Sequence, residues 1–419
     1  MVEVQKLSKG SIKTGKDFGI AFLNIIDSKT KDSDTSIVIF DRYINDSLKD
    51  VTRKKRSANI NPVKYHINDE MNLSHTSLKS LLSHTENKHN LTFFLKDKIL
   101  DHYQKSSRKI VTVCGTECFS NIGAKELRQH DHEEADTLIV YHCLETAKEN
   151  PGSRIEVYSI DTDVYILLLY FAHEIDTSEL YFIASRGKSK KVINIKKRAF
   201  TLGKQKCRAL LGFHAFTGTD WGGKFASISK KSWIKTFLRL DERDEIISAL
   251  SSLGNYYEKP NDEICTILER FVCMTYAPKS TELTLQGLRW EMFRLQSKEG
   301  EKLPPTRSSL LPHLWRSNYM TYMWKSSRHL QMELPSPDSY GWVKGEIFEP
   351  VLCLQPAAPM AMLALLKCHC KTGCSSGRCG CKKNKLNCTD ACSCGDCENQ
   401  RTEKLECISE VDDNSDNED

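Results

Sequence analysis

The sequence predicts an α/β fold in which a mostly parallel sheet is flanked by helices and followed by a helical extension and a small cysteine-rich module. Three observations predict it. Residues 1–237 alternate short apolar runs with segments of helical periodicity, which is typical of strand–helix–strand units in an open, mostly parallel sheet. Residues 238–345 keep helical spacing but are interrupted by prolines. Nine of the 17 cysteines lie between Cys368 and Cys397.

The strands and helices of the α/β part follow in a regular order. A short strand of the buried type covers residues 37–40 and ends at Asp41. Residues 57–88 are rich in Ser, Asn, Lys and His, and we expect a flexible insertion there. The apolar run 164–171 predicts a helix that is buried on nearly all sides. The other expected elements are helices at 91–103 and 136–147 and strands at 109–113, 155–159, 179–184 and 191–195.

The rest of the chain divides by composition. Residues 238–345 form the helical extension, and we expect its tryptophans to anchor the packing. These are Trp290, Trp315, Trp324 and Trp342. A linker rich in Pro, Ala and Leu at 346–366, the cysteine module at 367–400 and an acidic, disordered tail at 401–419 complete the expected organisation.

Hydropathy and charge exclude some classes of protein. The longest apolar run, Val164 to Ala172, has nine residues, whereas a membrane-spanning helix needs about 20, so we expect no membrane span. The N-terminus has no apolar segment of the secretory type, and we expect a protein that is not secreted. The net charge of +5 includes the acidic tail, so the rest of the chain is more basic and suits a polyanionic partner. A solvated face or a localisation signal is the alternative for the basic clusters.

Acidic residues stand at the ends of successive predicted strands and at helix starts. They are Asp41 after the first strand, Glu134 and Asp136 in HEEADT, Asp161 and Asp163 in SIDTDV, and Asp220 in FTGTD. Functional groups of open α/β sheets gather at the carboxyl ends of the strands, and carboxylate oxygens suit Mg²⁺ or Mn²⁺. Two such ions would activate a water and stabilise the leaving oxygen in phosphodiester cleavage. The alternative is that each acid caps a helix or lies in its first turn. His214, just before the last acid, is interpreted as structural.

The order of these motifs resembles the PIN-like nuclease core of the flap-endonuclease superfamily. The motifs FD, EEADT, DTDV and GTD, the last followed by Gly and Lys, are more similar still to an uncharacterised group of invertebrate, often transposon-associated proteins. The resemblance implies that the six acids named above hold two divalent ions. It also implies a further acid on the first strand, and no Asp stands at such a position, so we expect that acid upstream of Met1 or lost.

Basic residues follow the acids in two places. Lys49, Arg53 and Arg56 recur at helical spacing after Asp41, which suits phosphate contact, and the resemblance implies that they clamp the scissile phosphate. Residues 222–231 resemble a glycine-and-lysine hairpin that grips the duplex backbone. The lysines implied there are Lys224, Lys230 and Lys231.

The cysteine module repeats thiols at C-x-C and C-x2-C spacing. Its nine cysteines are Cys368, Cys370, Cys374, Cys379, Cys381, Cys388, Cys392, Cys394 and Cys397. So short a segment with few large apolar side chains needs crosslinks or metal for order, and nine thiols with no secretory signal favour zinc over disulfides. Three four-ligand sites would need twelve thiolates, so three shared thiolates predict a three-zinc cluster.

This spacing resembles the CXC module of tesmin-type proteins, which implies zinc and DNA contact. Nearby cations, Lys382 and Lys383 among them, would meet the phosphates. A zinc knot with a structural role only is the alternative, because no tyrosine for minor-groove readout lies between Cys368 and Cys397.

Together these features predict a nuclear or nucleo-cytoplasmic, metal-dependent nuclease. It would be structure-selective, would act on DNA by a two-metal mechanism, and would have DNA and chromatin proteins as partners. One alternative is a catalytically inactive nucleic-acid or chromatin-binding protein that retains the fold. Another is an interaction scaffold in which the acids are helix caps and the zinc module binds protein.

Overall fold

The computed structural model describes the chain from residue 12 to residue 399, apart from several internal segments. These are 45–46, 50–62, 75–77, 124–128, 178, 187–188, 220–221, 297–301, 356–366, 372, 384–386, 389–391 and 395–396. The chain divides into two compact units, Met1–Leu352 and Cys353–Asp419. Arg53, Arg56, Asp220, the acidic tail and most of the predicted linker lie outside the described residues.

The strands of the first unit form two small three-stranded sheets. One contains β1 (Thr35–Ile39), β2 (Lys109–Cys114) and β3 (Glu117–Ser120); the other contains β4 (Arg154–Tyr158), β5 (Glu179–Arg186) and β6 (Ser189–Asn194). In each sheet the first pair is parallel and the second antiparallel. Two short hairpins pair β7 (Gly218–Thr219) with β8 (Gly223–Lys224) and β9 (Trp342–Lys344) with β10 (Phe348–Pro350).

The α/β class is therefore confirmed, although the described strands are not assigned to a single mostly parallel sheet. The unpredicted strand β3 is one reason for the difference. Gly115 adopts a positive φ of 67°, which lets the chain turn tightly after β2 and return antiparallel to it. β6 was predicted as a strand, and it also pairs antiparallel to its predecessor.

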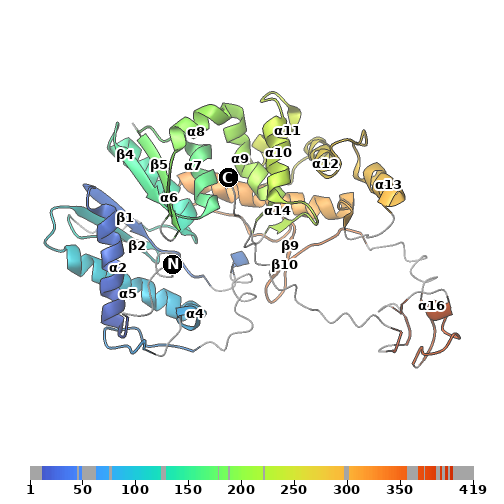
Figure 1. The fold of residues 1–419 in the computed structure, drawn as a ribbon, viewed down its shortest axis with the longest axis horizontal. Helices are drawn as coiled ribbons and strands as arrows, with labels where there is room; N and C mark the ends of the chain where they lie inside the picture. The colour runs from blue at the N-terminus through green and yellow to red at the C-terminus, as the bar shows by residue number, and fades with distance from the viewer. Residues whose placement is uncertain are drawn as a thin grey trace. The chain divides into compact units, whose positions relative to one another are not determined.

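Helices cover the sheets and form the extension (Figure 1). In the α/β part they are α2 (Gly15–Thr30), α4 (Leu78–Leu81), α5 (Thr85–Tyr103), α6 (Ala135–Glu149), α7 (Thr162–Phe171), α8 (Ile195–Leu202) and α9 (Lys204–Thr217). In the extension they are α10 (Lys230–Arg239), α11 (Glu245–Ser252), α12 (Asp262–Tyr276), α13 (Leu285–Gln296), α14 (Arg307–Lys325) and the 3-10 turn η2 (Ser326–Arg328). The second unit has one short helix, α16 (Gly380–Lys383), among its described residues.

The predicted helices at 91–103, 136–147 and 164–171 are confirmed as α5, α6 and α7. Helix α2 was not predicted. It begins with a capping box in which Thr14 and Asp17 each accept a backbone N–H of the other. None of the described helices combines the length and the apolar character that a membrane crossing requires.

Two large hydrophobic cores and one small cluster organise the described part of the first unit. The smaller core packs α2 and α5 against β2, with Phe18, Leu95 and Ile110 fully buried. The larger core runs from α6 to β9, so the helical extension shares it with β4 and β5. The predicted boundary after residue 237 falls inside α10.

Helix α6 contacts both sheets. Its Leu138 and Tyr141 pack with Val113 of β2, whereas its Val140 belongs to the larger core together with Val157 of β4. Helix α7 beside it buries most of its apolar side chains, as predicted. The N-terminal ends of these two helices carry four of the predicted site acids, so their packing fixes the site.

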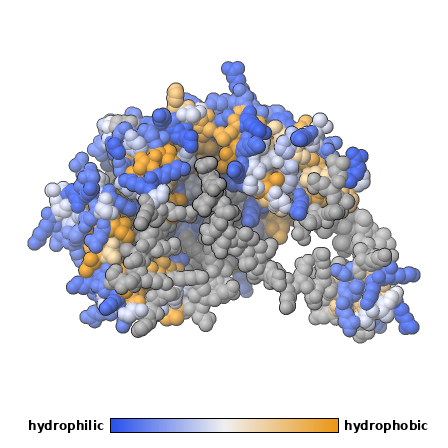
Figure 2. Space-filling view, viewed as in Figure 1, coloured by the Kyte–Doolittle hydropathy of each residue, from blue (hydrophilic) through white to orange (hydrophobic). Residues whose placement is uncertain are grey.

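The packing differs from expectation at two places. The described part of residues 57–88, where a flexible insertion was expected, contributes Met71, Leu73, Leu81 and Leu82 to the smaller core. The composition of the segment did not indicate these buried apolar positions, because polar residues flank them. Trp290 is 66% exposed on α13 instead of anchoring the extension, whereas Trp324 and Trp342 are buried. Among the residues that Figure 2 colours by hydropathy, hydrophilic ones predominate and hydrophobic ones lie in separate groups.

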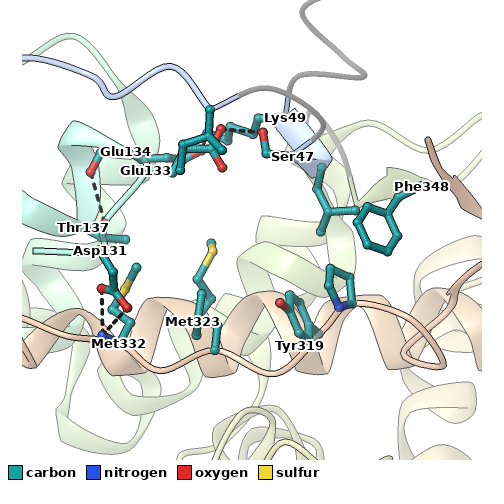
Figure 3. Close-up of a pocket in the computed structure, with 14 residues that line it drawn as sticks. Ser47, Lys49, Asp131, Glu133, Glu134, Thr137, Tyr319, Met323, Met332 and Phe348 are labelled. Atoms are coloured by element: carbon teal, nitrogen blue, oxygen red, sulfur yellow. Dashed lines mark hydrogen bonds and ion pairs between the residues drawn. The ribbon is translucent and has the colours of Figure 1, made fainter. Parts of the chain in front are cut away.

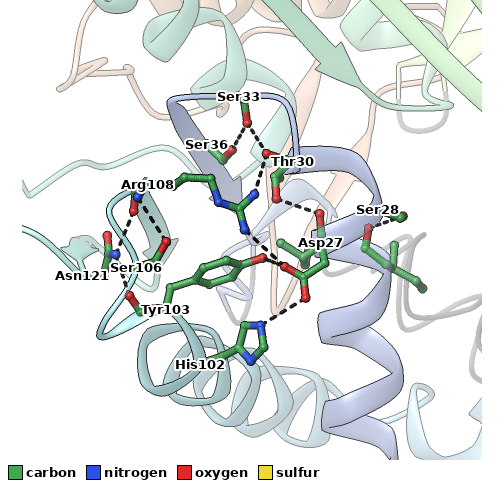
Figure 4. A network of polar contacts seen from close by, with 12 residues as sticks. Asp27, Ser28, Thr30, Ser33, Ser36, His102, Tyr103, Ser106, Arg108 and Asn121 are labelled. Carbon is green, nitrogen blue, oxygen red and sulfur yellow. Dashed lines mark hydrogen bonds and ion pairs between the residues drawn. The ribbon is translucent and has the colours of Figure 1, made fainter.

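A polar network on the first sheet ties the N-terminal helix in place (Figure 4). Asp27 of α2 accepts hydrogen bonds from the hydroxyl of Tyr103 and, at 3.1 Å, from the ring of His102. Arg108 lies 3.5 Å from the same carboxylate and donates to the carbonyl of Thr30 at 2.8 Å. These contacts join α2, α5 and the start of β2, and they account for the acid at position 27 without a ligand.

Candidate metal centres

Three of the predicted acids converge in the first unit. Oxygens of Asp136, Asp161 and Asp163 all lie within 4.8 Å of one another. Asp136 is in the first turn of α6, and Asp161 is the N-cap of α7. The side chain of Asp161 accepts the backbone N–H of Asp163 at 2.9 Å, so a local capping bond sets the spacing of the pair. The helix-cap alternative therefore describes Asp161 correctly, but it does not explain why the three carboxylates meet.

Asp41 and Glu134 stand beside this aspartate cluster, the name we use for Asp136, Asp161 and Asp163. Asp41 follows β1 and accepts the backbone N–H of Ala135 at 3.1 Å, which links the end of β1 to the start of α6. Glu134 is buried at the N-cap of α6, and its carboxylate forms an ion pair with Lys49. Asp41 thus lies near the cluster, whereas Glu134 already has a cationic partner.

The charges of the aspartate cluster are unevenly balanced. Burial, and then the negative charges of Asp161, Asp41 and Asp163, raise the pKa of Asp136 well above its ordinary value, despite the opposing charge of Lys49. Burial also acts to raise the pKa of Asp163, but the hydrogen bond from His214 and nearby positive charges lower it overall. The site holds more negative charge than its described cations offset, which fits the binding of a cation.

His214 is a site residue that the sequence analysis set aside as structural. It lies on α9, is 6% exposed, and its Nε2 is 2.8 Å from Oδ1 of Asp163. Its ring lies against that of Trp324, with ring centres 5.6 Å apart. The sequence signal was its place on the helix that leads into the GTD motif, but no local spacing shows that this helix packs beside α7.

The predicted phosphate-binding lysines fall into two groups. Lys49 is paired with Glu134, and the ammonium of Lys230 donates to the carbonyls of His214 and Gly218 at 3.0 and 2.9 Å. Burial lowers the pKa of Lys230 to about 8. Lys230 therefore faces inward and supports the segment around His214, whereas contact with a duplex backbone would require its ammonium group to be exposed. Lys224 in the β7–β8 hairpin and Lys231 are exposed.

A cavity of about 330 Å³ adjoins Glu134 and Lys49 (Figure 3). Its polar side contains Ser47, which donates to Glu133 at 2.7 Å, as well as the paired Lys49 and Glu134. Its opposite side contains Tyr319 and Met323 of α14. No sequence motif indicated this cavity, since its walls come from segments as far apart in the sequence as Ile44 and Phe348.

The cysteine module forms the second candidate centre. Six pairs of sulfur atoms lie 3.5 to 3.9 Å apart, from Cys394–Cys397 to Cys368–Cys388. A disulfide requires about 2.05 Å, and none of the nine described cysteines of the module forms one. Two thiolates on one tetrahedral zinc, each about 2.3 Å from the ion, lie about 3.8 Å apart. The sulfur spacing therefore fits metal-bound thiolates.

Groups of four sulfurs in this module share members. The described residues contain three such groups, and Cys368 belongs to all of them. Cys374, Cys379 and Cys388 each belong to two groups, whereas Cys370 belongs to one. This overlap supports the predicted sharing of thiolates, and the module could hold metal ions. Around it, Lys371, Arg378, Lys382 and Lys383 are exposed.

Comparison with known proteins adds no family to this description. No protein-family model matches the chain, and no curated protein matches it. The two centres themselves therefore provide the evidence for function.

Proposed function

We propose that the first unit is a divalent-metal-dependent, structure-selective nuclease that cleaves phosphodiester bonds of DNA. The observation that carries the proposal is the convergence of Asp136, Asp161 and Asp163 within 4.8 Å. A set of oxygen ligands with excess negative charge suits Mg²⁺ or Mn²⁺ better than softer metals. Asp41, next to the cluster, is a fourth candidate ligand.

When two such ions are bound, they lower the pKa of a water and stabilise the leaving oxygen of the phosphodiester. The protein's own residues supply the position and the charge balance. The capping bond in α7 fixes Asp161 relative to Asp163, and His214 orients Asp163. The positive charge of Lys49 acts on Asp136 and Asp163, where a phosphate would bind.

The arrangement of the strands supports a PIN-like fold. Two parallel pairs, β1–β2 and β4–β5, both pack against α6. Asp41 and Asp161 follow the carboxyl ends of β1 and β4, where ligands of open α/β sheets bind. We propose that the two pairs are halves of one PIN-like sheet whose edge carries the acids.

The second unit is proposed to be a zinc module that contacts DNA. Its sulfur spacing fits zinc, and the sharing of Cys368 supports a cluster of three ions. Four exposed cations around the module suit contact with phosphates. A protein with this pair of activities would act in the nucleus, beside chromatin proteins.

The decisive experiment incubates labelled flap, hairpin and single-stranded DNA with the protein and Mn²⁺. The control replaces both ligands, Asp161→Ala with Asp163→Ala. Loss of residues that merely support a ligand costs metal sites about 10–100-fold, so the double variant should lose more than about 100-fold of the cleavage rate. Equal cleavage by both proteins would contradict the proposal, because the activity would then not depend on the aspartate cluster.

Binding without cleavage is the second candidate function. The observation that favours it is that the exposed cations of the cysteine module need no contribution from the aspartate cluster. In that case DNA binding weakens steeply with salt in both the wild type and the double aspartate variant, while neither cleaves.

A further inference from the structure

The cavity beside the aspartate cluster has two chemically different sides. One side is apolar and comes from the C-terminal part of the unit, with Met323 of α14, Met332 and Phe348. The other side is polar and carries Lys49 and Glu134. Figure 3 shows Met323 and Tyr319 across the cavity from Ser47 and Lys49. At about 330 Å³, the space is at the lower end of the range for small-molecule sites.

The polar side is held in place by bonds to neighbouring elements. Both oxygens of Asp131 accept the backbone N–H of Met332, at 2.8 and 3.0 Å, and one also accepts that of Glu333. His132 bridges Thr137 and the carbonyl of His329, at 2.9 Å each. The loop before α6 is therefore fastened to the segment after α14, and the cavity between them is fixed before any ligand arrives.

Lys49 links the cavity to the carboxylates of the aspartate cluster. It lines the cavity, pairs with Glu134, and its charge acts on the carboxylates of Asp136 and Asp163. A ligand that fills both places has a phosphate at one end and a flat, largely apolar group with a polar edge at the other. A nucleotide has this chemistry, since bases are held by stacking on apolar side chains and by hydrogen bonds to their edges.

We propose that this cavity binds the base of an unpaired DNA nucleotide whose phosphate lies at the aspartate cluster. The inference rests on the proposed nuclease function and makes it more specific. A base in a duplex is stacked and paired on both sides, so only an unpaired or extruded base reaches the cavity. The cavity thus selects DNA with an unpaired nucleotide at the point of cleavage.

The test measures binding of single-stranded oligonucleotides in Ca²⁺ by fluorescence anisotropy. A scan places one abasic site at each position in turn, and 2-aminopurine at the most sensitive position reports stacking by its fluorescence. Because stacking of one base changes affinity by roughly 5- to 140-fold, the abasic oligonucleotide should bind more weakly by that factor at one position. Met323→Trp, which fills the cavity, should weaken binding of the intact oligonucleotide by the same factor and change binding of the abasic one little.

Two controls separate folding from binding. Met292→Trp changes the same residue type at a half-buried position on α13, away from the cavity. It should leave unchanged the loss of affinity caused by the abasic site, which we call the abasic effect. Phe348→Ala enlarges the cavity without filling it and should reduce the 2-aminopurine signal even if Met323→Trp fails to fold. An abasic effect that persists in full in Phe348→Ala and Met323→Trp overturns the inference, as does the absence of any abasic effect.

The same measurements distinguish this inference from the proposed function. If the wild type cleaves DNA in Mn²⁺ but shows no abasic effect, the nuclease stands and the base site is rejected. If it binds with the abasic effect but never cleaves, the base site stands and the nuclease is rejected. If it neither binds nor cleaves, both are rejected.

Discussion

The two candidate metal centres are built in opposite ways. The aspartate cluster is attached to helices α6 and α7, which pack into the large core of the first unit. The buried cluster of the second unit, where the structure describes it, consists of cysteines alone. One centre therefore sits on a fold that exists without it, whereas the other is itself the core. If both centres bind metal as proposed, metal adds function to the first centre and folding free energy to the second.

Removal of metal should produce the largest difference between the two centres. A zinc-selective chelator should unfold the second unit completely and leave the melting temperature of the first unit unchanged, because only the module lacks an apolar core. The measurement is limited trypsin digestion with peptide mapping. Cleavage at Lys371, Arg378, Lys382 and Lys383 should accelerate by orders of magnitude, since metal contributes roughly 10–16 kcal/mol to the folding of small zinc domains. Added Zn²⁺ should restore resistance, and resistance that survives chelation would mean that metal does not organise the module.

Two cysteine substitutions test whether metal ions share ligands within the module. Cys368→Ser should remove two or more metal ions, because Cys368 belongs to all three groups of sulfurs, whereas Cys370→Ser should remove at most one. Native mass spectrometry counts the ions in each variant. Equal losses would show that the ions do not share Cys368, and the proposed cluster would then be wrong.

The sequence predicted the two centres to different degrees for the same physical reason. The module's ligands lie within one short segment, so their spacing alone predicted the gathering that the sulfurs show. The aspartates come from two helices, and their meeting was predicted only through a rule about strand ends. His214 and Met323 were missed because they reach the site through the packing of α9 and α14, which no local pattern encodes.

The fold was predicted in the same uneven way. Helices with strong periodicity, such as α5 and α6, were found, and so was the apolar α7. Helix α2 was missed although its capping residues Thr14 and Asp17 are visible in the sequence, because its neighbours are mixed in polarity. The pairing of strands, including the antiparallel β3, depends on contacts across the sheet and on the turn at Gly115.

At the aspartate cluster, substitutions of His214 test whether a neighbouring side chain orients a ligand. The amide nitrogen of Gln can take the place of Nε2, whereas that of Asn falls short. His214→Asn should therefore weaken Mn²⁺ binding by about 10-fold or more, and His214→Gln should retain most of it, because supporting residues change metal affinity by about 10–100-fold. Electron paramagnetic resonance of free Mn²⁺ measures the affinity directly. Equal affinities in the two variants would assign His214 a packing role beside Trp324 instead.

The smallest expected effect concerns the stability of the first unit without metal. Burial and neighbouring carboxylates raise the pKa of Asp136 in the folded state above its ordinary value of 3.8. The folded state then binds more protons than the unfolded state above that pH, so the free energy of unfolding should fall as pH rises from about 4 toward the raised pKa. Asp136→Asn should abolish this fall and stabilise the metal-free unit at neutral pH by roughly 1–2 kcal/mol, within the range of single substitutions.

Urea unfolding in EDTA at pH 5 and pH 8, followed by tryptophan fluorescence, measures this difference. Its matched control is Asp27→Asn, which removes a carboxylate whose pKa is lowered by its partners Tyr103 and His102. That substitution should destabilise the unit, because it removes a favourable pairing. Added Mn²⁺ should then stabilise the wild type more than Asp136→Asn, so that the difference between their free energies of unfolding becomes smaller or changes sign. If Asp136→Asn destabilises the metal-free unit as Asp27→Asn does, the carboxylate of Asp136 stabilises the fold by itself and the proposed cation site is contradicted.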